Sequence, residues 1–337
     1  ATRPKGLTAT TCRRVGHGGR PYPQGMRILP ILLLPAALPA FACGVCGCST
    51  HTDWASQGLW RGPGFRFDLR ADFAKQDQLR SGTRALDRDA FPLPAGEEVQ
   101  VQTLNRNLTL GLDWSPTADW GFTLALPLVH RTHETYAEGD AEVSSSRHSG
   151  LGDVRLVGRY LGISENRSFG LQVGVKLATG NHEATFHTGP QAGEPVDRGL
   201  QAGTGTTDLI LGAFAFGELA PGYSGFAQVQ WLVPTSAPAA FRPGNTFTFV
   251  AGLRREGSGR VTPQLQLNGR VEKPETGTEA DAANSGATLA YLSPGLEVKL
   301  GSQVGLTALV QIPVYQRVSG IQIQPRYLAS LSLHVAF

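Results

Sequence analysis

The chain of 337 residues contains one methionine, Met26, and only four cysteines. No run of eighteen apolar residues follows residue 42, so the sequence predicts no transmembrane helix. The formal net charge of +3 is too small to indicate a nucleic-acid-binding protein. The G-x-S-x-G, H-E-x-x-H and phosphate-loop motifs are also missing, so we expect no enzyme activity.

The segment MRILPILLLPAALPAFA (26–42) has the features of a secretory leader. Arg27 supplies a positive charge, the apolar stretch 28–38 is too short to span a bilayer, and 40–42 forms a small-x-small cleavage site. Its three prolines disfavour a buried core helix. We therefore predict a signal peptide at 26–42, preceded at 1–25 by translated sequence upstream of the true start.

A period of two begins after this leader. In FRFDLRADF (65–73) the residues at odd positions are apolar and those at even positions are charged, which predicts a strand with one apolar face. Eleven more segments share this pattern: 104–114, 120–128, 153–161, 169–179, 207–216, 224–234, 247–254, 261–272, 288–300, 304–315 and 326–337. Most have about 9 to 12 residues, the length that a tilted membrane strand needs.

The links between these segments alternate in length. Five links are short: SPTAD, GISENRS, GELAPGY, REGSGR and GSQ. The links that alternate with these five are long and polar. This alternation is typical of an outer-membrane barrel with short periplasmic turns and long extracellular loops. We therefore predict an all-β, 12-stranded antiparallel up-and-down barrel over 63–337, ending on the aromatic Phe337. The alternative is a soluble exported β-protein, whose apolar faces would form a core.

In a membrane barrel the polar face of each strand lines the lumen. This assigns charged residues of both signs to the lumen, where we expect cross-strand ion pairs. The predicted lumen-lining residues are Arg66, Asp68, Arg70, Asp72, Asp113, Asp153, Arg155, Arg159, Lys176, Arg270, Glu272, Glu297, Lys299 and Arg326. Because the two signs nearly balance, strong ion selectivity is not expected.

The mature N-terminus would read CGVCGCSTH (43–51), within a segment 43–62 that lies in the periplasm or plugs the barrel mouth. A disulfide from Cys43 to Cys46 or Cys48 is one interpretation. A soft-metal site for Cu(I) or Zn(II) on Cys43, Cys46, Cys48 and His51 is another. A lipid on Cys43 is disfavoured, because Ala40 stands where a lipobox needs a larger aliphatic residue.

Four short blocks resemble a known family. SGLGDVRLVGRY (149–160), VGVKLATG (173–180), GTGTTDLILG (203–212) and YLSPGLEVKL (291–300) are similar, in this order, to the recurrent blocks of the "MetA-pathway of phenol degradation" family. The resemblance covers about residues 100–337 and departs at Ala178, where the family has proline. It implies a transporter-like outer-membrane barrel that passes small organic molecules; the cysteine segment is not part of it.

The function expected from these features is passage of a small polar or amphipathic solute across the outer membrane. The alternatives are a metal-binding or thiol-active barrel that uses the cysteine segment, and a purely structural barrel. The expected partners are outer-membrane lipid, the barrel-insertion machinery and the solute, without nucleic acid. The sequence does not indicate the oligomeric state.

Overall fold

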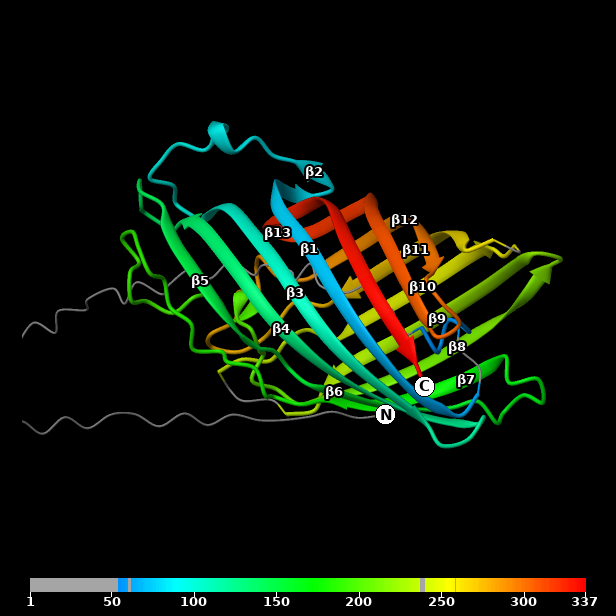
Figure 1. Ribbon diagram of the computed structural model, residues 1–337. Helices are drawn as coiled ribbons and strands as arrows, with labels where there is room; N and C mark the ends of the chain where they lie inside the picture. The colour runs from blue at the N-terminus through cyan, green and yellow to red at the C-terminus, as the bar shows by residue number, and fades with distance from the viewer. Residues whose placement is uncertain (1–53, 60–61, 237–239, 258) are drawn as a thin grey trace, which may run out of the picture. The chain divides into compact units, whose positions relative to one another are not determined.

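The computed structural model describes residues 54–59, 62–236, 240–257 and 259–337 (Figure 1). These residues form thirteen strands and two short 3-10 turns, η1 (Arg88–Ala90) and η2 (Arg198–Leu200). The strands are β1 (Gly64–Gly82), β2 (Arg84–Ala85), β3 (Val99–Ser115), β4 (Trp120–Tyr136), β5 (Ser144–Leu151), β6 (Arg155–Tyr160), β7 (Phe169–Lys176), β8 (Asp208–Ala220), β9 (Tyr223–Pro234), β10 (Thr246–Arg255), β11 (Val261–Glu272), β12 (Ala287–Lys299) and β13 (Val304–Ala336). In this part of the chain, no helix is long and apolar enough to serve as a membrane span.

The strands form a closed antiparallel barrel, which confirms the predicted all-β class. Eleven strands follow one another around the wall, while β2 pairs with β1 and β5 pairs with β4 outside this path. The long β13 closes the wall, because its first half pairs with β12 and its second half with β1. The pairings run from Gly305 opposite Lys299 to Ala336 opposite Arg66.

The period of two decides which side chains face outward. Large apolar side chains cover the outside, and Phe65, Val173 and Val314 each keep about 60% of their surface exposed. Amides and charges point inward: Gln172 and Gln266 are each 1% exposed. The arrangement is inverted relative to a soluble protein and is typical of a barrel surrounded by lipid.

Several strands are longer than the sequence predicts. β1 continues to Gly82, β3 begins at Val99, and β4 continues to Tyr136. In these extensions both faces carry polar residues, so the hydrophobic pattern stops, but the antiparallel ladder goes on. The segment predicted at 153–161 also differs: β5 and β6 both pair with β4 and are separated by residues 152–154.

The two ends of the barrel differ. One end, called here the short-link end, carries the links 116–119, 161–168, 221–222, 256–260 and 300–303. Aromatic rings gather there: Trp120 packs on Tyr160 with centroids 4.7 Å apart, and Phe65 stacks on Trp114. The opposite end, the long-loop end, carries 86–98, 137–143, 177–207, 235–245 and 273–286.

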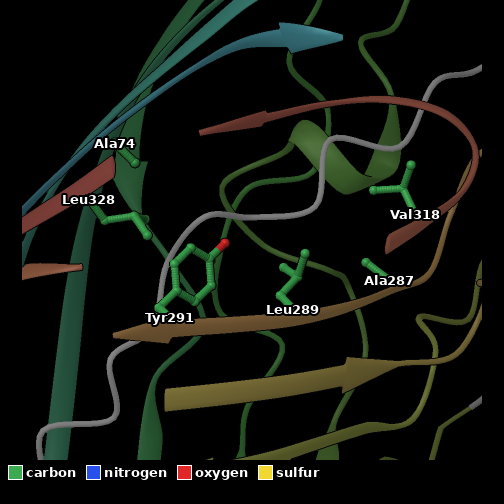
Figure 2. Packing of buried hydrophobic residues seen from close by; sticks show 6 residues of the cluster. All are labelled: Ala74, Ala287, Leu289, Tyr291, Val318 and Leu328. Carbon is green, nitrogen blue, oxygen red and sulfur yellow. The ribbon is translucent and has the colours of Figure 1, made fainter. Parts of the chain in front are cut away.

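Apolar side chains fill part of the barrel interior towards the long-loop end. Figure 2 shows Ala74, Leu289, Tyr291 and Leu328 among six side chains that point into the space between β1, β12 and β13. A second cluster packs the 86–98 loop onto β1 and β13 around Leu79, Val99 and Ile323. No member of either cluster lines the cavity described below.

Candidate functional site

A cavity of about 660 Å³ lies inside the barrel. The described residues that line it include eight basic and eight acidic side chains, together with apolar ones such as Ile210, Leu232 and Phe241. Residues 198–204 of the long 177–207 loop bound it at one end. Trp54, Leu59 and the 300–303 link bound it at the other, so the cavity reaches from one end of the barrel almost to the other.

Asp113 organises the charges nearest the short-link end. Its carboxylate accepts hydrogen bonds from Arg66 Nη1 at 2.8 Å, from Arg159 Nη2 at 2.7 Å and from Thr123 Oγ1 at 2.7 Å. Arg159 Nη1 also contacts the second carboxylate oxygen, and the Arg159 side chain is only 2% exposed. Inside a barrel such charges are stable only when they are paired and hydrogen-bonded, and this group satisfies both conditions.

Lys176 organises the charges nearest the long-loop end. Its Nζ atom lies 2.8 Å from Asp208 Oδ2 and 3.2 Å from Asp153 Oδ2. Asp153 also accepts hydrogen bonds from the backbone amides of Gly180 and Thr204, at 3.0 and 2.9 Å. The same carboxylate therefore neutralises a wall lysine and holds the long loop against the wall.

Further ion pairs run along single strands or between neighbours. Arg70 Nε lies 2.8 Å from Asp72 Oδ2, and Arg270 Nη2 lies 2.8 Å from Glu272 Oε2. His334 Nδ1 lies 2.8 Å from Asp68. Most of these lumen charges are thus paired with the opposite sign and do not form a ring of one sign, which does not suit strong ion selectivity.

Residues 54–59 occupy the interior at the short-link end. Ser56 and Gln57 are fully buried, and Arg254 of β10 donates to the Gln57 carbonyl and to its Oε1 atom, both at 2.8 Å. The Arg254 guanidinium lies 4.2 Å from the Phe226 ring centroid, and Trp54 packs edge-on against His334 at 4.7 Å. We call this short segment the plug.

The 177–207 loop folds over the other end of the cavity. Arg131 of β4 donates through Nη1 to the Gln201 carbonyl at 3.2 Å, and through Nε to Asn105 at 2.5 Å. Gly180 and Gly203 touch, and a Cβ on Gly180 would lie 2.6 Å from the Gly203 Cα atom. Glycine is needed at this contact because no side chain fits between the two backbones. We call residues 177–207 the lid.

The lid also buries a carboxylate among others of its own sign. Asp197, which precedes η2, is 7% exposed and its Oδ2 atom has no hydrogen-bond partner among the described residues. Burial, followed by the charges of Glu98, Glu275 and Asp281, raises the pKa of Asp197 well above its ordinary value. Burial also raises the pKa of Asp281. Among the described residues, no group of three or more His, Cys, Asp or Glu is arranged to hold a metal ion.

The structure brings most of the predicted lumen residues together around the cavity: Arg66, Asp68, Arg70, Asp72, Asp113, Asp153, Arg155, Lys176, Arg270, Glu272, Glu297 and Lys299. Arg159 also points into the barrel and pairs with Asp113, but its side chain is only 2% exposed and does not line the cavity. Arg326 does not line the cavity; its side chain is 66% exposed and pairs with Asp77. The register of β1 with β13 shifts between Ala74 and Gln76. The alternation of inward and outward residues counted back from Phe337 is interrupted there, so it wrongly predicts that Arg326 faces the lumen.

Other contacts of the site were not predicted from the sequence. A plug was one of the two roles expected for 43–62, but the anchor Arg254 and the lid contacts of Arg131 depend on segments that meet only after folding. Conversely, Cys43, Cys46, Cys48 and His51, proposed above as a disulfide or metal site, lie outside the described residues.

Comparisons with known proteins support the fold. No protein-family profile and no curated protein matches the chain. An outer membrane channel from Pseudomonas putida F1 has a similar structure, with a TM-score of 0.57 and 11% identity over 82% of this chain and 96% of that one. The autotransporter NalP translocator domain from Neisseria meningitidis (0.46; 11% identity; 84% and 92% covered) and the CymD monoaromatic hydrocarbon channel (0.44; 7%; 88% and 98%) are less similar. The first of these similarities shows that the chain has the fold of an outer-membrane β-barrel.

Proposed function

We propose that this protein is an outer-membrane channel for a small polar or amphipathic solute. The observation that carries the proposal is the cavity of about 660 Å³, enclosed by the barrel wall and bounded by the lid and the plug. Pockets of this size accommodate small organic molecules. The mixture of neutralised ion pairs with Ile210, Leu232 and Phe241 suits a solute that has both polar and apolar parts.

We further propose that the short-link end faces the periplasm and the long-loop end faces the outside, as in other outer-membrane barrels. The link lengths support this orientation, because periplasmic turns are short in such barrels, and the aromatic rings beside the short links indicate a membrane interface there. In this proposal β5 and β6 form one interrupted wall strand. β13 turns at Gly320, whose φ is +62°, and provides two strands, so that the wall has twelve.

The parts of the chain before the barrel have proposed roles as well. We propose a cleaved signal peptide at 26–42 and a mature segment 43–62 that enters the barrel from the periplasm, with residues 54–59 as its plug. We also propose that the insertion machinery recognises the aromatic Phe337, which is 73% exposed and donates its amide to the Phe65 carbonyl. The ordered blocks at 149–160, 173–180, 203–212 and 291–300 support membership of the transporter-like family named above.

The channel is tested in planar lipid bilayers. The purified protein is expected to give discrete conductance steps, and a barrel that stays sealed at all voltages would exclude an open pathway. The substitution Arg254→Gln removes two hydrogen bonds to the plug and its contact with Phe226. We expect a larger or more frequent conductance in this variant, because the plug is held less firmly.

Arg255→Gln is the matched control. Arg255 is the next residue along β10 and points outward, so its loss removes the same charge without touching the plug. Equal conductance in Arg254→Gln and the parent protein would contradict the gating role of the plug. Equal increases in both variants would indicate a general charge effect.

A further inference from the structure

Basic side chains gather on one part of the outer barrel wall. On β3 the outward-facing residue after Leu108 towards the long-loop end is Arg106, and the register places it beside Phe73 of β1 and His130 of β4. In the next outward row, Lys75 of β1 lies opposite Leu104, and Arg147 of β5 lies opposite Thr132. The exposed Arg326 of β13 adjoins Lys75 through Asp77, which is 3.2 Å from both. We call Lys75, Arg106, Arg147 and Arg326 the wall patch.

The wall patch carries more positive than negative charge. Its carboxylate neighbours on the outer face are Asp77 and Glu134, and Glu134 accepts a hydrogen bond from Gln102 at 2.9 Å. His130 pairs with Ser149 at 2.6 Å. Arg106 and Arg147 are exposed, and the described residues provide no ion-pair partner for either guanidinium. Two arginines therefore remain available to an external anion.

The position of the patch relative to the membrane follows from the strand geometry. Trp114 marks the aromatic row at the short-link end, and Arg106 is eight residues further along β3. Eight residues extend about 26 Å along a strand, or about 19 Å along the barrel axis at a tilt near 45°. The row of Lys75 and Arg147 lies about 24 Å from the aromatic row, close to the height of about 25 Å for an apolar band. Arg106 is near enough to this boundary to extend its guanidinium to it.

The other side of the barrel lacks such a patch. Within strands β6 to β12, the outward-facing residues are uncharged except Arg255, which ends β10 at the short-link end; other exposed charges on this side, such as Lys273, lie in the links beyond the strand ends. Leu209, Leu211, Val233 and Val271 occupy corresponding outward positions towards the long-loop end. A general need for solubility beyond the membrane would distribute charge around the whole rim. The concentration on β1, β3, β5 and β13 indicates a localised ligand.

We propose that the wall patch binds the phosphate groups of the phosphorylated, multiply acylated glycolipid that forms the outer leaflet of the outer membrane. Arginine matches phosphate oxygens in geometry and charge. The apolar rows directly below, such as Leu108, Leu128 and Leu331, would receive the acyl chains. A free phosphate would not contact these apolar rows. A ligand that has both phosphate groups and acyl chains therefore fits the surface better. The inference rests on the membrane orientation given under Proposed function.

The test measures glycolipid binding by the full-length mature protein in detergent, titrated with bisphosphorylated lipid A and followed by native mass spectrometry. The double variant Arg106→Gln/Arg147→Gln is expected to bind about tenfold more weakly, because each basic side chain near an anionic surface contributes to affinity. The control Arg255→Gln/Arg260→Gln removes the same charge from exposed positions at the short-link end and should bind like the parent. Heat-modifiable migration on a gel verifies that each variant is folded.

Two additional ligands identify the source of the anion. Lipid A stripped of both phosphates should bind the parent protein as weakly as the double variant binds the intact lipid, and inorganic phosphate alone should not compete at millimolar concentration. Unchanged affinity in the double variant, an equal loss in the control, or equal binding of the stripped lipid would each overturn the proposal. The conductance of the double variant should equal that of the parent. If the barrel does not conduct but still binds the lipid through the wall patch, the proposed channel function is contradicted and the proposed lipid binding is retained.

Discussion

Asp113 illustrates how single residues keep charges inside this barrel. It accepts hydrogen bonds from Arg66, Thr123 and Arg159, which come from three different strands. The Arg66 and Arg159 side chains are only 12% and 2% exposed, so their guanidinium groups bind few water molecules. The Asp113 carboxylate accepts the hydrogen bonds that water would otherwise accept. Removal of one partner from such a group costs more than the pair contributes, because the remaining charges stay buried.

The substitution Asp113→Asn is therefore expected to lower the free energy of unfolding by about 3–5 kcal/mol. Urea unfolding of the protein in detergent or lipid vesicles, followed by tryptophan fluorescence, measures this change. Asp119→Asn serves as the comparison, because its pair with Arg167 is exposed, at 39% and 50%. Exposed pairs contribute about 0–1 kcal/mol, so similar losses in the two variants would contradict the role given to Asp113.

At the scale of elements, the lid connects the barrel wall with the other long loops. Asp153 and Arg131 hold it from below, and Arg198 of the lid pairs with Glu279 of the 273–286 loop at 3.4 Å. Asp197 faces the carboxylates of Glu98, Glu275 and Asp281. These loops therefore pack best when at least one of the carboxyls keeps its proton.

The pH dependence of the lid follows from the raised pKa of Asp197. The folded protein binds this proton more tightly than the unfolded chain does, so the associated stability is complete below about pH 4, the ordinary pKa of aspartate. It is lost as the pH rises through the higher pKa of the folded state. In Asp197→Asn this loss should be missing, so the variant should gain stability relative to the parent between pH 4 and pH 8.

Unfolding free energies of both proteins at several pH values measure the effect. Glu138→Gln, which changes an exposed loop carboxylate, is the control and should follow the parent at each pH. A constant difference between parent and Asp197→Asn across this range would contradict the buried-proton account.

At the scale of the whole molecule, the closed barrel depends on lipid around its wall. Leu331 of β13 faces outward, pairs with Ala71 of β1 and lies in the same row as Leu108 and Leu128. This row is near the middle of the proposed apolar band. Leu219, at the end of β8, is 70% exposed and lies at the boundary.

Leu331→Arg is expected to destabilise the folded barrel in vesicles by about 2–4 kcal/mol, and Leu219→Arg by about 0–1 kcal/mol, because the cost of a charge depends on its depth in the bilayer. Reversible unfolding from lipid vesicles measures both values. Equal costs would indicate that the two positions lie at one depth and would contradict the proposed band.

The sequence alone predicts the antiparallel barrel class, because alternation with a period of two depends on local side-chain order. It also assigns most inward charges, since parity persists along each regular strand. Parity fails at Arg326, where the register between β1 and β13 shifts, and the hydrophobic pattern does not reveal the extensions of β1, β3 and β4.

The cavity and its two boundaries belong to the tertiary structure. The sequence places Arg254, Gln57, Asp153 and Gly203 on segments that are far apart, and nothing in their local pattern indicates that they meet. Closure of the wall brings the inward charges into one space, where most of them are paired with a charge of opposite sign. The local pattern thus determined which side chains face inward, and the packing of lid, plug and wall decided which of them surround an open cavity.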